Sequence, residues 1–222
     1  VVNLTDSSGW NWSWEDDPLA LGARLITLGS DREVALKFLI HAPLSHPGGP
    51  DAGSTHHFEA SVMDQFGIKD NWDFRLETGR QRSIQITSGG GSISMPPNSI
   101  AVLDIELKNT GNSVDDIRAE LFSDNNGVEQ IGSLISIDGW GVILLDDSLA
   151  AGVDPWSTGR IRMQISTPSD STGSLDFGIR AGPVGLPHQD FSFTSIVIST
   201  RISGSFSVDS GDCENIEPGE DC

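Results

Sequence analysis

The sequence has few basic residues: 13 Lys and Arg face 32 Asp and Glu, for a formal net charge of -19. Such a charge repels nucleic acid and anionic lipid and leaves no basic stripe along which phosphates could bind. The only lysines are Lys37, Lys69 and Lys108. A weakly compensated acidic surface suits a saline or calcium-containing exterior, and we do not expect nucleic acid to be a partner.

Long apolar runs and helix-period stretches are also missing. The longest apolar run lies around residues 142–145, far short of the roughly 18 residues that span a bilayer, so we expect no membrane insertion within these residues. The 25 Gly and 11 Pro lie between short runs rich in Val, Ile, Thr, Ser and Phe, which is typical of many strands joined by turns. The sequence therefore predicts an all-β protein, and its 222 residues suit two domains.

Cysteine is nearly absent, and the two that occur, Cys213 and Cys222, lie close together at the end of the sequence. We interpret them as a disulfide, because two thiolates alone cannot fill a tetrahedral zinc site and the nearest histidine in sequence is distant. A disulfide indicates an oxidising compartment. Asn3 and Asn11 each begin an Asn-X-Ser/Thr tripeptide and are candidate glycosylation sites. Together these features favour an extracellular or cell-surface location.

An internal repeat is the most informative feature. Gly9-Trp10 followed by Asp16-Asp17-Pro18-Leu19-Ala20 recurs, with the same spacing, as Gly139-Trp140 followed by Asp146-Asp147-Ser148-Leu149-Ala150. Downstream, an alternating strand that stops at Pro43 matches one that stops at Pro168, and the following turns lead to Phe58 and Phe177. Since period-2 alternation fixes which side chains face the core, the repeat predicts matching core positions for Trp10 and Trp140, for the two strands that end in proline, and for the two phenylalanines.

The repeat also predicts a domain organisation. We expect an immunoglobulin-like module over residues 1–80 that is incomplete at its N-terminus, a complete module over 81–204, and a tail or the start of a further module over 205–222. The first copy lacks a counterpart of the upstream strands in 83–107. Missing strands would leave an unpaired sheet edge, and such edges attract partners.

These residues carry a family resemblance. The strand that ends in Asn109-Thr110-Gly111-Asn112, the Gly-Trp strand start, and the strand that ends in Pro before a Gly-Ser turn resemble tandem Ig-like modules of bacterial and archaeal surface proteins. They are similar to domains of the CARDB type and to the Ig-like module associated with alpha-galactosidases. The resemblance covers nearly all of residues 9–200 and implies tandem immunoglobulin-like β-sandwiches. It also implies a spacer, adhesive repeat or enzyme appendage.

Each candidate site in the sequence also has a structural explanation. Trp10, Trp12 and Trp14 alternate and so share one face of a strand; a sugar platform is the alternative to a core face, which the repeat favours. Adjacent acids at 16–17, 115–116 and 146–147 point to opposite faces, which disfavours a glycosidase pair. Asp124 and Asn126 are weak calcium candidates in a loop rich in oxygen ligands, with solvated acids as the alternative. His41, His46, His56 and His57 lack the i, i+4 helix spacing of a zinc enzyme.

Motifs for catalysis are also missing. The glycine run 89–91 lacks the Lys and helix of a phosphate loop, and no Gly-x-Ser-x-Gly elbow occurs. The sequence predicts no enzyme, no catalytic residues and no cofactor except possible calcium. It predicts a non-catalytic structural or adhesive repeat region that binds other protein modules or copies of itself through sheet edges, with glycans as a further candidate partner. The alternatives are an accessory carbohydrate-binding or spacer module of an extracellular hydrolase, and a calcium-tuned filament or S-layer-like subunit.

Overall fold

Strands make up nearly all of the regular structure. The computed structural model describes residues 1–6, 10–20, 22–43, 47–67, 69–125, 128–169, 173–187 and 191–201. The first module contains β1 (Val2–Asp6), β2 (Asn11–Trp14), β3 (Phe38–His41), β4 (Thr55–Met63) and β5 (Lys69–Glu77). The second contains β6 (Ile84–Ile86), β7 (Gly91–Met95), β8 (Ile100–Asn109), β9 (Asp115–Asn125), β10 (Val128–Gly132), β11 (Leu134–Ile137), β12 (Trp140–Leu144), the 3-10 turn η1 (Asp146–Ser148), β13 (Leu149–Val153), β14 (Thr158–Ser166), β15 (Ser174–Pro183) and β16 (Ser192–Thr200). The predicted all-β class is confirmed.

The second module is a sandwich of two sheets. One sheet has the order β11-β12-β14-β8-β6; the other has the order β10-β9-β15-β16-β7, and β13 also pairs with β9. When β6, β8, β9, β12, β14, β15 and β16 are counted from one to seven, the sheets read 1-2-5-4 and 3-6-7. This is the strand order of an immunoglobulin constant-type sandwich. The module is therefore immunoglobulin-like by its topology.

Alternating apolar residues fill the space between these sheets. Ile105, Leu121, Val142, Ile165 and Ile196 have no exposed surface, and they come from five different strands. Strand β7 completes the second sheet by pairing in parallel with β16, with Gly91 opposite Ile196 and Met95 opposite Thr200. Met95 is buried in the same core, so β7 both extends the sheet and closes the side of the sandwich.

The first module has a smaller version of the same arrangement. Its sheets are β1-β4-β5 and β2-β3, which correspond to 3-6-7 and 4-5 in the count used above. Leu4, Trp14 and Phe58 are buried, and the Trp10 and Phe58 ring centroids lie 6.1 Å apart. No strand corresponding to β6, β7 or β8 occurs among the described residues of this module. Together the two modules form tandem immunoglobulin-like sandwiches.

Strand pairing has the same register in both modules. Trp12 lies opposite Ile40 and Trp14 opposite Phe38, just as Val142 lies opposite Ile165 and Leu144 opposite Met163. The hairpins also correspond, because Phe58 faces Phe74 where Phe177 faces Ile196. Strands β1 and β9 also have the same register, because Leu4 lies opposite Ala60 in β4 and Leu121 lies opposite Ile179 in β15. Five strands of the first module, β1 to β5, thus have counterparts in β9, β12, β14, β15 and β16.

Burial differs between the copies at several repeat positions. Phe58 and Phe177 are both buried, but Trp140 is 5% exposed whereas Trp10 is only half-buried and precedes β2. Pro43 is half-buried and Pro168 buried. The expectation that Trp10 lies in the core as Trp140 does was therefore too strong. The described first module has fewer strands than the second, with none that corresponds to β6, β7 or β8, and so it encloses its core less completely.

The strand predicted to end at Pro43 is also shorter than expected. Residues 34–37 lie outside β3, and Val34 is 48% exposed. In the second module β14 pairs along its whole length with β8, whereas β3 pairs only with the four residues of β2. A strand extends only where neighbouring backbone satisfies its hydrogen bonds, so β3 is short.

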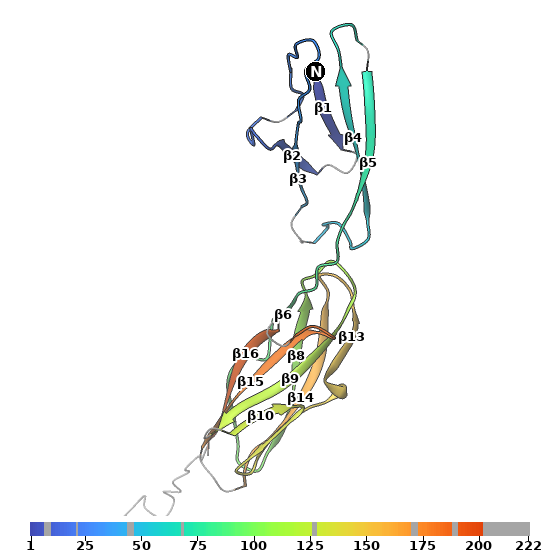
Figure 1. Cartoon of the computed structure of the whole chain (residues 1–222). Helices are drawn as coiled ribbons and strands as arrows, with labels where there is room; N and C mark the ends of the chain where they lie inside the picture. Colours follow the sequence, from blue (N-terminus) through green and yellow to red (C-terminus); the bar gives the residue numbers. More distant parts are fainter. Residues whose placement is uncertain are drawn as a thin grey trace, which may run out of the picture.

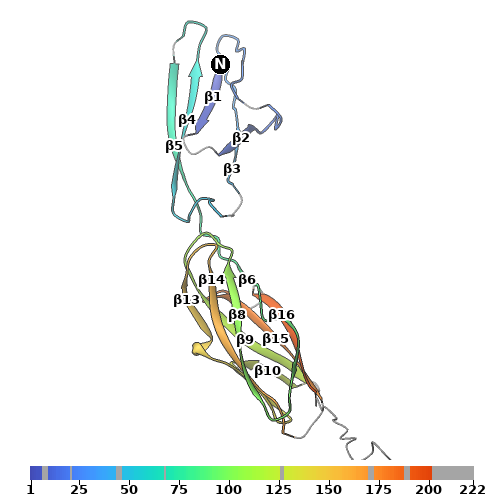
Figure 2. The same ribbon diagram turned by 180° about the vertical axis from the view of Figure 1, so that it is seen from behind.

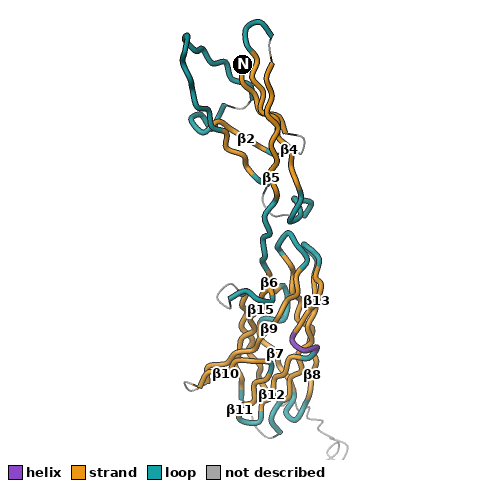
Figure 3. The backbone as a smooth tube through the Cα atoms, turned by 45° about the vertical axis from the view of Figure 1, so that its right-hand side comes forward, coloured by secondary structure: helices purple, strands orange, loops and turns teal. Residues whose placement is uncertain are grey.

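The two modules lie end to end, with the first above the second in Figure 1 and again when seen from behind in Figure 2. A single stretch of loop joins β5 to β6 (Figure 3). The predicted boundary between residues 80 and 81 lies in this linker. None of the described residues forms a helix that is long and apolar enough to cross a membrane.

Candidate functional site: the junction between modules

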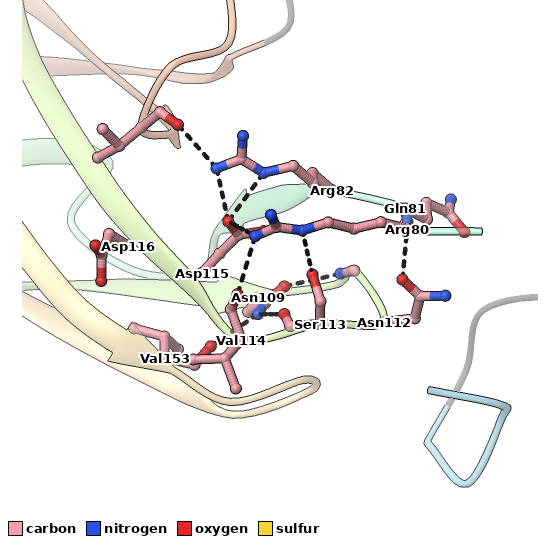
Figure 4. Close-up of polar contacts among 12 residues, drawn as sticks. Arg80, Gln81, Arg82, Asn109, Asn112, Ser113, Val114, Asp115, Asp116 and Val153 are labelled. Atoms are coloured by element: carbon pink, nitrogen blue, oxygen red, sulfur yellow. Dashed lines mark hydrogen bonds and ion pairs between the residues drawn. The ribbon is translucent and has the colours of Figure 1, made fainter. Parts of the chain in front are cut away.

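The linker after β5 carries two arginines that converge on one buried carboxylate. Arg80 donates from Nη2 to Asp115 Oδ1 at 2.8 Å, and Arg82 donates from Nε to the same oxygen at 2.9 Å. The Asp115 side chain is 1% exposed, whereas Arg82 is 21% and Arg80 51% exposed. Figure 4 shows both guanidinium groups beside Asp115 at the start of β9. The ion pairs tie the linker to the second module.

The same arginines also bind neutral groups. Arg80 donates from Nε to Ser113 Oγ at 2.8 Å and from Nη2 to the Val114 carbonyl at 3.1 Å. Arg82 donates from Nη2 to the Val184 carbonyl, which lies between β15 and β16, at 2.8 Å. Because a planar guanidinium presents several donors in fixed directions, these bonds fix both side chains as well as neutralising charge.

Asn112 makes a second set of bonds with the linker. The Gln81 amide donates to Asn112 Oδ1 at 2.7 Å, Asn112 Nδ2 donates to the Gly79 carbonyl at 3.0 Å, and the Asn112 amide donates to the Gln81 carbonyl at 3.1 Å. The Asn112 carbonyl in turn accepts from the Ala52 amide, in the loop before β4, at 2.9 Å. Asn112 therefore contacts the linker and the first module at once.

The loop that presents Asn112 is itself held by a buried side chain. Asn109 has no exposed surface, and its Nδ2 donates to the Ser113 and Val153 carbonyls at 2.8 and 2.9 Å. Its Oδ1 accepts from the Gly111 amide at 2.9 Å. A Cβ at Gly111 would overlap the Gln81 carbonyl oxygen and lie 3.2 Å from Arg82 Cα, so only glycine lets the linker backbone pass this closely. This explains the Asn109-Thr110-Gly111-Asn112 motif in physical terms.

In each pair of adjacent acids, at least one carboxylate takes part in an ion pair or hydrogen bond. Arg24 donates to both carboxylate oxygens of Asp16, at 2.7 and 2.9 Å, and Arg162 donates to both oxygens of Asp146, at 2.6 and 2.9 Å. These bonds lower the pKa of Asp16 and of Asp146 below its ordinary value. Asp116 accepts from the Gly152 amide at 2.8 Å. These contacts give the carboxylates a structural role, since each binds a donor of its own module.

The tryptophans of the first module pack on other rings. Trp14 is buried, its Nε1 donates to the Gly22 carbonyl at 3.1 Å, and its ring centroid lies 4.6 Å from Phe38. Trp12 is half-buried and meets Trp14 edge-on at 5.7 Å. Ser13, on the opposite face of β2, is also buried, and its Oγ lies 3.0 Å from His41 Nε2.

His41 and His56 contact hydroxyl groups. His56 Nε2 lies 2.9 Å from Thr78 Oγ1 and 3.1 Å from Ser54 Oγ, and its ring is 4.1 Å from that of Trp10. Over the described part of the chain, no three His, Cys, Asp or Glu side chains group closely enough to hold a metal ion. His46 lies outside the described residues.

Several sequence-predicted sites remain predictions. Asn11 is exposed at the start of β2 and Asn3 is half-buried in β1, so glycosylation at Asn11 meets no steric obstacle from burial. Asp124 belongs to β9 and lies opposite Glu129, but its side chain and Asn126 fall outside the described residues. Cys213 and Cys222 do so as well.

Sequence reasoning did not find the junction. The Asn-Thr-Gly-Asn motif by itself predicts a strand end, and Asp115 stands out in the sequence only as one of two adjacent acids. The usable signal was the pair Arg80 and Arg82, which alternate in a linker that follows one strand and precedes the next. Two positive charges at this spacing in so acidic a chain indicate a specific carboxylate partner.

Comparisons with known proteins add little. No family model matches the chain, and no curated protein is detectably similar in sequence. Solved structures with weak similarity include the CupB6 tip adhesin from Pseudomonas aeruginosa (10% identity, TM-score 0.33, 90% of this chain and 79% of that chain). Another is chicken VE-cadherin EC1-2 (11% identity, TM-score 0.30, 67% of each chain). A chimeric titin Z1Z2-Z1Z2 tandem matches at 14% identity and TM-score 0.32, over 91% of this chain and 84% of that chain.

The fold assignment rests on strand order and register and does not depend on these matches. The resemblance to CARDB-type modules stays a hypothesis.

Proposed function

We propose that this chain is a non-catalytic structural and adhesive repeat region of a secreted or cell-surface protein. The observation that carries the proposal is the bonded junction, in which Asn112 holds both the linker at Gly79 and Gln81 and the first-module loop at Ala52. A repeat region of a surface scaffold needs its modules held in a defined succession. The junction provides that here.

Modules joined by one linker usually move relative to one another unless specific contacts hold them. Here the linker from Gly79 to Arg82 is hydrogen-bonded at both backbone and side chains, and the guanidinium groups are anchored on a buried carboxylate. Each such bond contributes roughly 0.5–1.5 kcal/mol, and bonds to charged groups contribute more. We therefore expect the two modules to keep one mutual orientation in solution and to act as an extended element.

The orientation can be tested by small-angle X-ray scattering on the full chain. The wild-type curve should fit a single end-to-end arrangement. Asn112→Ala removes the side-chain bonds to Gly79 and Gln81 and should broaden the distance distribution, while Gln85→Ala, at an exposed position of β6, should not. A wild-type chain that already scatters as two independently moving modules would contradict the proposal.

The location is tested separately. Antibodies raised against the purified chain should label intact, unpermeabilised source cells or their culture medium. Label that appears only after permeabilisation would exclude a surface or secreted role, whatever the rigidity of the junction.

A further inference from the structure

Two glycines lie on the outer face of β15, in the middle of its sheet. Strand β15 pairs with β9 on one side and with β16 on the other (Figure 1), and its Phe177 and Ile179 belong to the core. The alternate residues Gly178, Arg180 and Gly182 therefore face away from the core. A glycine inside a strand leaves room for a close contact over the backbone.

Aromatic rings occupy the room above both glycines. Phe122 of β9 and Phe193 of β16 lie over Gly178, with ring centroids 4.8 Å apart and ring planes inclined by 37°. A Cβ at Gly178 would overlap both rings, and a Cβ at Gly182 would overlap the ring of Phe191. Phe193 is 54% exposed, and Phe122 and Phe191 are half-buried. Solvent therefore reaches aromatic rings at two positions along the outer face of one strand.

The rings of Phe122 and Phe193 are walls of a hollow of about 290 Å³. Its size is close to the lower limit of roughly 300 Å³ for small-molecule sites. The other walls include Val197, which is apolar, and Asp176 and Ser195, which are polar and exposed. Apolar ring surface and hydrogen-bonding groups thus line the same hollow.

An ion pair separates the two ring positions. Arg180 lies opposite Phe193 and donates from Nε and Nη2 to Glu120 Oε2 at 3.0 and 2.9 Å. The Arg180 side chain is 23% exposed and that of Glu120 9%. A guanidinium presents five donors in one plane, and this one is held in a defined position between the two glycines that the rings cover.

We propose that this face binds a neutral glycan, with sugar rings stacked on Phe122, Phe193 and Phe191. The C–H groups on one face of a sugar ring carry partial positive charge and are attracted to the negative face of an aromatic ring. Hydroxyls at the edge of the sugar donate to the Asp176 carboxylate and exchange hydrogen bonds with Ser195. The inference names a ligand for the adhesive role and in that respect rests on the proposed function.

The spacing of the rings favours a chain of several sugars over a single one. Gly178 and Gly182 are four residues apart, which corresponds to about 13 Å along a strand. One sugar ring does not span this distance, whereas a linked chain that follows β15 contacts rings at both positions and passes over Arg180 between them. We therefore expect affinity to rise with the length of the glycan.

Charge and width disfavour other occupants of this face. The net charge of -19 per chain opposes contact with a second copy, with acidic lipid and with acidic glycans. A protein partner would bury roughly 800 Å² on each side around a centre depleted in charge, but here Arg180 interrupts the rings, and Asp176 and Ser195 border them. A neutral ligand with apolar faces and hydroxyl edges matches this composition.

A glycan array probed with the full chain tests the ligand class. The array carries dimers to hexamers of glucose, mannose and galactose beside sialylated and sulfated glycans. The wild-type chain should bind neutral oligomers, and longer ones more tightly. Binding confined to the acidic glycans, or to none, would overturn the inference. So would self-association in sedimentation velocity that Phe193→Leu abolishes, because the face would then be an interface between copies.

Titration calorimetry with the neutral hexamer that binds most tightly on the array measures the role of the ring. Phe193→Leu keeps an apolar side chain over Gly178 but removes the ring, and should weaken binding about three- to tenfold, as expected for one aromatic contact. Phe66→Leu, at a phenylalanine of the first module that is 79% exposed, is the matched control and should bind as the wild type does. Circular dichroism checks that both variants are folded. Wild-type affinity in Phe193→Leu would contradict the stacking.

Phe191→Leu separates the two ring positions. It should weaken binding of the hexamer and leave binding of the corresponding dimer, followed by NMR titration, unchanged, because a dimer in the hollow beside Gly178 does not extend over Gly182. Phe193→Leu should weaken the binding of both. Equal losses for dimer and hexamer in Phe191→Leu would overturn the extended arrangement along β15.

The two proposals fail separately. A chain that binds no neutral glycan, yet scatters as one rigid end-to-end body and is found at the cell surface, would overturn this inference and leave the proposed function standing. A chain that binds neutral glycans through Phe193 but has a freely moving junction, or is found only inside cells, would have the opposite meaning.

Discussion

Arg82 lies against Asp115 with Nη2 2.6 Å from Oδ1, while Asp115 Oδ2 is buried without a hydrogen-bond partner in the described structure. One oxygen thus serves two arginines. Asp115→Ala should destabilise the second module by about 1–3 kcal/mol, below the roughly 3–5 kcal/mol of a fully buried pair because Arg80 is half exposed. Chemical denaturation measures this, with Asp104→Ala, at an exposed position of β8, as control. An equal effect of both variants would remove the special role of Asp115.

The ion pairs Asp16–Arg24 and Asp146–Arg162 should make stability depend on acid pH. Hydrogen bonds from Arg24 and Arg162 hold the pKa of Asp16 and of Asp146 below its ordinary value. A carboxyl whose pKa is lower in the folded than in the unfolded chain stabilises the fold above the unfolded pKa, and that contribution is lost as pH falls through the folded pKa. Both pairs are solvent-exposed, so the effect should be small and weakened by salt.

Carboxyl carbon NMR measures these two titrations directly. Arg162→Gln should return the Asp146 pKa toward its ordinary value and leave Asp16 unchanged, which makes Asp16 the internal control. An Asp146 titration that ignores the loss of Arg162 would show that the pair does not form in solution.

Gly178 on β15 is required by two aromatic rings. The rings of Phe122 and Phe193, on the flanking strands, lie over it with centroids 4.8 Å apart, and a Cβ at this position would overlap both. Gly178→Ala should therefore destabilise the module by about 1–3 kcal/mol through overpacking. Gly173→Ala, where a Cβ meets open space, is the matched control. Thermal unfolding of both variants compares them, and a Gly178→Ala variant as stable as Gly173→Ala would refute the packing argument.

The pairing of Cys213 with Cys222 stays a prediction from the sequence. Closing so short a loop contributes roughly 2–3 kcal/mol in the chain-entropy model. Alkylation without reductant, followed by mass spectrometry, should find neither thiol modified, and reduction first should expose both. Complete labelling of the unreduced chain would exclude the disulfide.

The sequence correctly predicted which side chains of the repeated strands are buried, where both sheets enclose those side chains. The burial of Trp14, Phe58, Phe177 and Trp140 follows from period-2 alternation, because alternation decides the face of a strand whatever its partner. Trp10 was predicted to be buried and is only half-buried, since its burial depends on how many strands enclose the core of its module. No local pattern around Trp10 reports that number.

The junction could not be predicted because its partners are distant in sequence. Arg82 reaches Asp115 because the turn that carries Asn109 and Gly111 places the start of β9 beside the linker. The apolar pattern of the strands does not predict the path of that turn. Glycine is needed at position 111 because the linker backbone at Gln81 and Arg82 passes close to it, and the sequence does not show this contact. Such positions become visible only in three dimensions.

The parallel pairing of β7 with β16 has a mechanical consequence. The chain enters the second module at the junction, and β16 ends at the opposite pole (Figure 1), so tension between the two ends loads β6 against β8 and β7 against β16, in both cases along the strand axes. The five residue pairs from Gly91–Ile196 to Met95–Thr200 then bear shear together, and none can open before the others. A ladder loaded in this way resists extension far better than a hairpin peeled from one end.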